Sequence, residues 1–354
     1  MPPHSTMPGS HHPSQSPRQQ GVILITLFAL LGVSALYLLI KQFNTAQLQI
    51  TRDQITTAAL IQAKEALIGR AVNDNNRPGV MSCPDIDDDG SAESPISYGG
   101  VCPSYIGRLP WKTLDLPDLR DGNGDRLWYA LSSSLRDDAS AQPINSSTPG
   151  NLTVDSTNQI AAIIFSPGPP LATQVGRPSN NVADYLDGSN ADADNNYTSG
   201  LISSRFNDRL MIISRDELFR AVNKRIVAEV RGSSPLGTSG SRLLGYYANP
   251  IHHEYPWAAA INNGVPTSGT LTGFVPYNVP GLFLPTWLAS NGWYDLITYS
   301  VAPEFQPGTA YPQHCIGTCI TVGNYTQAQA SVTITSTTTA MAICSTNLSV
   351  LVCP

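Results

Sequence analysis

The chain has 354 residues, with 28 glycines, 28 prolines and only 13% charged residues. This length allows two ordinary domains, and the composition favours turn-rich β structure over a helical bundle. The formal net charge is −6 and no local cluster of Lys and Arg is visible, so we expect no nucleic-acid partner.

The first part of the chain predicts a leader and a membrane-spanning helix. Residues 1–20 are rich in Pro, Ser and His and show no apolar periodicity, so we expect no fixed structure there. Residues 22–40 then form an apolar run that only Thr26, Gly32 and Ser34 interrupt. A helix of that length crosses a bilayer core of about 30 Å. We therefore assign 1–21 to a cytoplasmic leader and 22–40 to a transmembrane helix.

The helical pattern continues beyond this run to about residue 72. No proline occurs between Pro17 and Pro78, and apolar residues recur mostly at spacings of three, four and seven positions. The pattern predicts one long helix whose outer half is amphipathic and packs onto a head.

A short polar leader that ends in Gly21, followed by this apolar run and an amphipathic helix, resembles a type IV prepilin or a type II secretion pseudopilin. The resemblance implies that a prepilin peptidase cuts after Gly21 and that Val22 becomes the mature, methylated amino terminus. It also implies that the partners are other pilin or pseudopilin subunits, the peptidase and the inner membrane.

Two residues depart from the pattern of that family. Gln20 stands where Lys or Arg usually precedes the glycine, and Thr26 stands at the fifth mature position, which is normally Glu. In the family this Glu pairs with the amino-terminal amine of a neighbouring subunit. Its absence, shared by minor pseudopilins at filament tips, indicates a subunit that need not dock onto a preceding one. The alternative is an uncleaved signal anchor.

The head is predicted to consist of two β-rich modules, at 73–212 and 213–354. GRLPWKTL and RLWYAL in the first module are the more specific parts of a resemblance, over residues 18–232, to uncharacterised prepilin-like proteins of Gram-negative bacteria. Ser214 and Glu217 match a capping box ahead of an amphipathic helix that ends near residue 231. GLFLPTWLASNGWYDLITYSV, from Gly281, echoes the first module. We therefore expect an α+β fold: a long amino-terminal transmembrane helix packed on an antiparallel β head, with two tandem pilin-like helix-plus-sheet units. The alternative is that aromatic strands merely look alike.

The cysteines fall in three close pairs, and an even count fits an oxidising compartment. Six cysteines permit many connectivities, so local pairing is a hypothesis, and buried free thiols are the alternative. The hypothesis links Cys83 with Cys102, Cys315 with Cys319, and Cys344 with Cys353.

An acidic loop is the main candidate metal site. Asp85, Asp87, Asp89 and Glu93 stand at positions 1, 3, 5 and 9 of a calcium-type loop, and a glycine stands at position 6. Clustered carboxylates repel one another, which favours a bound Ca²⁺. Position 12 is Ile96 rather than the usual bidentate Glu. The alternative is a solvated acidic turn beside Cys83.

Weaker candidates are found elsewhere. Residues 190–194 have the 1, 3, 5 spacing without the glycine, and 121–125 are better explained as a turn. The pair His252 and His253 is interpreted as a surface loop, since adjacent strand residues point to opposite faces. No catalytic motif occurs in a plausible context, so we expect no enzyme.

These observations predict a minor pilin-like or pseudopilin-like structural subunit of a type IV pilus or type II secretion filament, positioned at its shaft or tip. The predicted location is the bacterial inner membrane, with a single pass and the head in the periplasm or on a surface filament. The alternative is a signal-anchored envelope adhesin or ligand-binding protein.

Overall fold

The computed structural model describes residues 18–95, 100–137, 142–232, 242–248, 254–303, 306–308, 330–334, 337–341, 343–346 and 349–352. Side chains are described at these positions except 18–23, 39–45, 247–248 and 337–352. The chain divides into two compact units, Met1–Gln54 and Ile55–Pro354.

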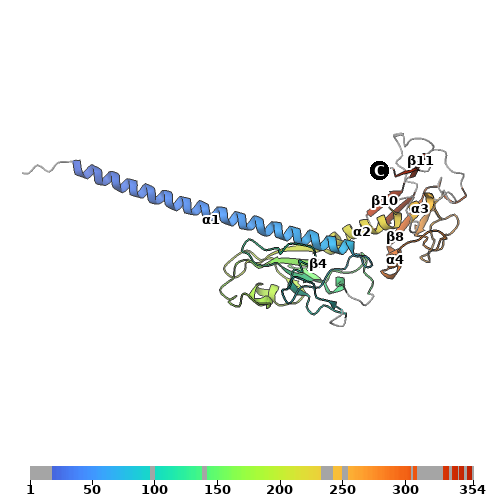
Figure 1. Ribbon diagram of the computed structural model, residues 1–354, viewed down its shortest axis with the longest axis horizontal. Helices are drawn as coiled ribbons and strands as arrows, with labels where there is room; N and C mark the ends of the chain where they lie inside the picture. Colours follow the sequence, from blue (N-terminus) through green and yellow to red (C-terminus); the bar gives the residue numbers. More distant parts are fainter. Residues whose placement is uncertain are drawn as a thin grey trace, which may run out of the picture. The chain divides into compact units, whose positions relative to one another are not determined.

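Helix α1 (Arg18–Asn73) has 56 residues and contributes to both units (Figure 1). No proline interrupts it, and polar side chains bond back to its own backbone: Ser34 Oγ donates to the Leu30 carbonyl at 2.7 Å. The chain turns away after Asn73, where the Asp74 carboxylate accepts the backbone N–H of Arg77 at 2.8 Å. Gly79 then takes a positive φ of 110° and donates to the carbonyl of Ala71, which closes the turn.

The prediction of a transmembrane helix is wrong. Across the part of the chain that the structure describes, no helix is both long enough and apolar enough to cross a membrane. Of the predicted span, only residues 24–38 have described side chains. The single-pass inner-membrane location that rested on this helix is therefore wrong as well.

The larger sheet lies within the second unit, in the order β1-β2-β4-β3-β5, and β6 also pairs with β4. Its strands are β1 (Ile106–Arg108), β2 (Trp128–Leu131), β3 (Leu152–Val154), β4 (Thr157–Ser166), β5 (Asn196–Tyr197) and β6 (Arg209–Ser214). All pairs are antiparallel except β3 with β5, which is parallel. The sequence had predicted an antiparallel head, and the parallel pair of β3 and β5 departs from that prediction.

Both faces of this sheet are covered. Seven consecutive residues of β4, 160–166, are buried, which requires packing on both sides. One face contributes Tyr129 and Ile164 to a core shared with Leu67 of α1. The opposite face contributes Trp128 and Phe165 to a second core beneath the segment between β4 and β6. That segment contains the 3₁₀ turns η3 (Val182–Asp184) and η4 (Gly188–Ala191).

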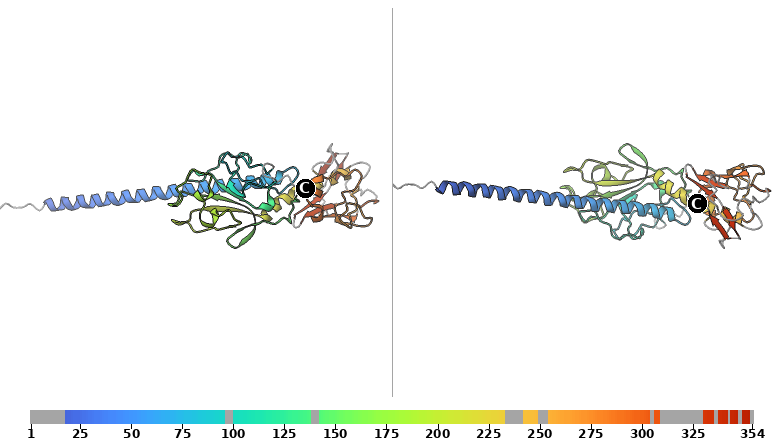
Figure 2. Two further views of the ribbon diagram at one scale, coloured as in Figure 1. Left: turned by 90° about the horizontal axis from the view of Figure 1, so that it is seen from below. Right: turned by 90° about the horizontal axis from the view of Figure 1, so that it is seen from above.

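Helix α2 (Arg215–Arg231) begins as the capping box predicts, because the Ser214 side chain accepts the backbone N–H of Glu217 at 3.1 Å. The predicted apolar stripe is buried, and it comprises Leu218, Val222, Ile226 and Val230. The helix contacts β4 and β6 of the larger sheet and also two strands of a second sheet, β9 (Ala330–Ile334) and β10 (Thr337–Met341) (Figures 1 and 2). Helix α2 is therefore shared between the two sheets. The predicted tandem arrangement required it to serve the carboxy-terminal module alone.

The second sheet has the order β10-β9-β8-β7, with every pair antiparallel. Its remaining strands are β7 (Thr272–Phe274) and β8 (Ile297–Val301). Burial alternates along β8, where Ile297, Tyr299 and Val301 face the core. The other elements of the second unit are the 3₁₀ turns η2 (Ser133–Leu135) and η5 (Tyr294–Leu296), the short helices α3 (Leu243–Ala248) and α4 (Thr286–Ser290), and the hairpin of β11 (Ile343–Thr346) and β12 (Ser349–Val352).

The fold is thus mixed α/β with a curled sheet shaped like half a barrel, and the predicted class of a transmembrane helix on an antiparallel head is wrong. The two sheets differ in strand number and in strand order. GRLPWKTL contributes strand β1 and a turn, whereas its predicted echo from Gly281 contributes the short helix α4.

Candidate cation-binding loop

The acidic loop at 85–93 is held at its start by the rest of the second unit. A disulfide joins Cys83, just before the loop, to Cys102, with the two Cα atoms 5.5 Å apart. Asp85 forms a backbone bridge to Arg108 of β1, through N···O distances of 2.7 and 3.0 Å. The start of the loop is therefore fixed to the edge of the larger sheet.

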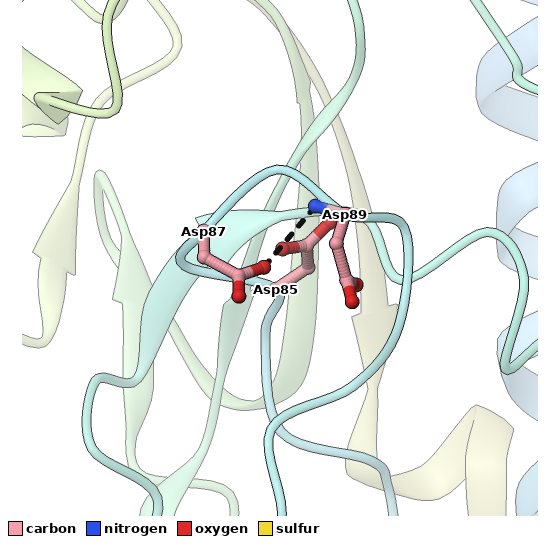
Figure 3. A group of neighbouring side chains, drawn as sticks. All are labelled: Asp85, Asp87 and Asp89. Carbon is pink, nitrogen blue, oxygen red and sulfur yellow. Dashed lines mark hydrogen bonds between the residues drawn. The ribbon is translucent and has the colours of Figure 1, made fainter.

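Three of the four predicted ligands come together. One carboxylate oxygen each from Asp85, Asp87 and Asp89 lie within 4.8 Å of one another, and Figure 3 shows the three side chains around one turn of the loop. Asp85 is 1% exposed, whereas Asp87 and Asp89 are exposed. Glu93 lies outside this group; its Oε1 accepts the backbone N–H of Ile86 at 3.3 Å.

The loop keeps its shape through hydrogen bonds to its own carboxylates. Asp85 accepts the backbone N–H of Asp88 at 2.8 Å with one oxygen and that of Gly90 at 2.7 Å with the other. Asp87 accepts the N–H of Asp89 at 3.1 Å, drawn as a dashed line in Figure 3. Gly90 has a φ of 88°, and a Cβ there would lie 2.6 Å from the Trp111 ring. The glycine is required on both counts.

The electrostatics of the loop differ between its buried and exposed carboxylates. Burial raises the pKa of Asp85, the N–H bonds from Gly90 and Asp88 lower it, and the charges of Asp87 and Asp89 raise it further. Hydrogen bonds from Ser91 hold the pKa of Asp89 below its usual value. A cation at the cluster would remove the repulsion that raises the pKa of Asp85.

Basic side chains already neutralise part of the loop. Asp88 lies 2.7 Å from Nη1 of Arg126 and 3.3 Å from Nε of Arg108. Lys112 donates to the backbone carbonyl of Asp89. None of these cations bonds to a carboxylate of Asp85, Asp87 or Asp89 within the described residues.

The donor set fits a hard divalent cation in part. Asp85, Asp87 and Asp89 would hold it, and each of their oxygens keeps a lone pair after the loop hydrogen bonds. Such an ion would supply positive charge that links the two ends of the loop. The twelfth loop position, Ile96, lies outside the described residues.

In the two weaker acidic loops, the polar side chains form hydrogen bonds within the fold. Asp121 is 3% exposed and accepts the N–H groups of Asn123 and Asp125 and the hydroxyl of Ser166, as expected of a turn. Asn190 is fully buried, and its amide bonds to Asp208 and to Thr198. Residues 190–194 therefore do not gather into a ligand set.

Several predicted site residues lie beyond what the structure describes. Gly21 and Val22 lie within α1, without described side chains. The side chain of Cys344 in β11 is likewise not described. Five other residues named in the sequence analysis lie outside the described ranges: Cys315, Cys319, Cys353, His252 and His253.

Two features near the loop had no signal in the sequence. A pocket beside β1 contains the buried side chains of Arg108 and Trp128. Asp208 is buried, and one of its oxygens has no hydrogen-bond partner among the described residues. Each brings together residues from distant parts of the chain, so no local spacing marks them.

Comparison of the chain with protein-family models, with characterised proteins and with solved structures gives no match. The function is therefore inferred from this chain's own residues.

Proposed function

We propose that the chain is a pilin-like structural subunit that assembles with other copies, or with related subunits, through the first half of α1. The observation that carries this proposal is a run of large apolar side chains within residues 24–38, each 53–69% exposed. They are Leu24, Ile25, Leu27, Phe28, Leu30, Leu31, Val33, Leu36, Tyr37 and Leu38. No charged residue interrupts the run.

The placement of these side chains favours several partner helices over one. Successive residues of a helix are separated by about 100°, so this run places apolar groups around the whole circumference. A two-stranded coiled coil covers only one stripe, whereas a helix that is apolar all round is stable when neighbours surround it. Covering each large side chain contributes about 1.5–3 kcal/mol, which is ample to hold a helical bundle together.

The resemblance of residues 1–40 to prepilins supports the same proposal, because it implies a subunit prepared for assembly by cleavage after Gly21. The threonine at position 26 favours a subunit that starts a filament over one that extends it. The alternative, a signal-anchored adhesin or ligand-binding protein, would not need the cleavage after Gly21.

The assembly proposal is tested with the full chain carrying Leu31→Asp and Leu36→Asp. Each aspartate would place a charge inside the helical bundle, so we expect the assemblies seen by electron microscopy and sedimentation to disappear. Thermal unfolding of the second unit should be unchanged, because both positions belong to the first unit. The matched control is Gln47→Asp, an exposed polar position of the same helix beyond the apolar run.

Two outcomes would contradict the proposal. One is a double variant that assembles as the unchanged chain does. The other is an unchanged chain that stays monomeric at every concentration at which it remains in solution.

We also propose that the loop at 85–93 binds Ca²⁺. The three gathered carboxylates of Asp85, Asp87 and Asp89 support this, as does the tight turn at Gly90. The ion would fix the segment between α1 and β1 and stiffen the second unit.

A further inference from the structure

A pocket of about 300 Å³ opens beside β1 and next to the acidic loop, which contributes Asp85 and Ile86 to its lining. Ile86, Ile106 and Val182 contribute apolar walls, and Arg108 and Trp128 contribute polar groups. This volume is at the small end of the range typical of ligand pockets, and a mainly apolar wall with a few polar groups is their usual composition.

Trp128 presents an unpaired donor in this region. The residue is 2% exposed, and its Nε1 is buried without a hydrogen-bond partner among the residues that the structure describes. Buried N–H groups without an acceptor are rare in folded proteins, and each calls for an explanation such as a bound molecule. Since Trp128 lines the pocket, an acceptor bound there could provide the missing partner.

Arg108 provides a second donor beside the indole. Its guanidinium Cζ lies 4.7 Å from the centroid of the Trp128 ring and 4.3 Å from that of Tyr185, so the group is held between two aromatic side chains. Nη2 donates to the carbonyl of Ser179 at 2.9 Å, and Nε lies 3.3 Å from the Asp88 carboxylate but forms no hydrogen bond among the described residues. Within the described part of the chain, Nη1 has no acceptor.

The charge around Arg108 is not fully balanced. Asp88 is shared between Arg108 and Arg126, and Asp118 is shared between Arg126 and Arg120. This continuous set of ion pairs therefore has three guanidinium groups for two carboxylates. At the end of the set that reaches the pocket, Arg108 shares its carboxylate with a second guanidinium group, which favours an anion as a further partner of Arg108.

Two other acidic residues near Arg108 have partners of their own. Asp125 pairs with Arg177 at 2.8 Å. Asp85 lines the pocket, but its carboxylate oxygens accept N–H groups of the acidic loop. Neither carboxylate bonds directly to the guanidinium of Arg108 within the described residues.

We propose that this pocket binds a small organic carboxylate through Arg108 Nη1 and Trp128 Nε1. An ionised carboxylate is an acceptor-only group with two oxygens, which matches donors from two residues that line the pocket, and a charged partner strengthens both hydrogen bonds. The apolar walls of the pocket accommodate a short hydrocarbon or aromatic part. The site does not involve the assembly helix, whereas Asp85 belongs both to the lining of this pocket and to the proposed Ca²⁺ site.

The test uses the full chain labelled with ¹⁵N at its five tryptophans, whose indole N–H signals are resolved by NMR. The signal missing from Trp128→Phe identifies Trp128. Sodium benzoate is then the carboxylate probe, and benzamide is its neutral counterpart of the same shape. We expect benzoate to move the Trp128 signal saturably, with a dissociation constant of about 1 mM or lower. Benzamide should bind about tenfold more weakly or worse, because it lacks the charge.

Two variants separate binding from folding. Arg108→Gln removes the charge and should weaken benzoate binding by about tenfold or more. Ala193→Trp obstructs the exposed rim of the pocket without touching either donor, and should also abolish the shift. Ala172→Trp adds the same side chain at an exposed alanine outside the lining, and should bind benzoate as the unchanged chain does.

The proposal is overturned if benzoate leaves the Trp128 signal in place, or if benzamide moves it equally. It is also overturned if Ala193→Trp binds benzoate normally, since the probe would then occupy another place. The Ala193→Trp variant tests the proposal even if Arg108→Gln fails to fold.

Discussion

The side-chain amide of Asn291 donates a hydrogen bond of 2.9 Å to the backbone carbonyl of Asn76. The same amide donates to the carbonyl of Trp287, and its oxygen accepts the N–H of Ile144 at 3.3 Å. Asn145 in turn donates to the Asn291 carbonyl at 2.8 Å. One buried residue after α4 thus links the segment after α1 and the segment before β3.

This relationship predicts that Asn291→Ala lowers the free energy of unfolding. The substitution removes the amide oxygen that accepts the N–H of Ile144, which is a buried residue. We expect the free energy of unfolding, measured by urea denaturation, to fall by about 1–3 kcal/mol. Ser290→Ala is the matched control: its hydroxyl is exposed, so the change should be within about 0.5 kcal/mol. Equal stability of the two variants would contradict a linking role for Asn291.

Calcium is expected to raise the melting temperature of the full chain. An ion that binds only the folded protein adds about 2.7 kcal/mol at a hundredfold excess over its dissociation constant. Sites of this kind are often weak, so calcium at about 1–10 mM is the appropriate range. Asp87→Ala combined with Asp89→Ala should abolish the shift, whereas the exposed Asp192→Ala should retain it. Melting that responds neither to calcium nor to EDTA would leave the loop as an acidic turn.

The disulfide between Cys83 and Cys102 should contribute measurably to stability. It closes a loop with a sequence separation of 19, for which the expected contribution is about 3 kcal/mol. We expect Cys83→Ala with Cys102→Ala to lower the denaturation midpoint accordingly. Non-reducing peptide mapping should find this link in the unchanged chain, and it also tests the predicted links of Cys315 with Cys319 and of Cys344 with Cys353. A free thiol at Cys83 would refute the expectation.

Stability should fall as the pH rises through neutrality because of Asp208. Burial raises the pKa of this carboxyl from 3.8 to about 7, and the nearby charge of Asp187 raises it too, while bonds from Asn190 and from the Asp187 backbone lower it. A pKa that is higher in the folded state gives a contribution that is fully present below about pH 4. It is lost as the pH rises through about 7.

The measurement is urea denaturation of the unchanged chain and of Asp208→Asn between about pH 5 and pH 8. The asparagine resembles the protonated acid, so its stability should decline less over this interval. Identical pH profiles for the two proteins would show that Asp208 keeps an ordinary pKa.

Local patterns in the sequence were sufficient for some elements. The capping pair Ser214 and Glu217 and the stripe ahead of Arg231 predict α2, because both signals depend on residues three or four positions apart. The spacing of Asp85, Asp87 and Asp89 also predicted that their carboxylates lie close together, since a single tight turn positions all three.

Other features depend on contacts that no local pattern records. A membrane environment was wrongly predicted for the first part of α1 from its apolar composition. Composition alone does not indicate which molecules cover an apolar helix. Glu93 has a suitable spacing, yet it bonds to the N–H of Ile86. The pocket combines Arg108 of β1 with Trp128 of β2 and Val182 from a distant turn, a set that only the folded sheet assembles.

The most direct test of the pilin-like proposal is mass spectrometry of the amino terminus of the protein isolated from its native cells. The proposal predicts a chain that begins at Val22, carries a methyl group on its amine, and depends on Gly21 for this processing. Gly21→Val should therefore yield the longer chain. If the native protein retains residues 1–21, or if Gly21→Val leaves its mass at the processed value apart from the substitution, the chain is not a processed pilin-like subunit.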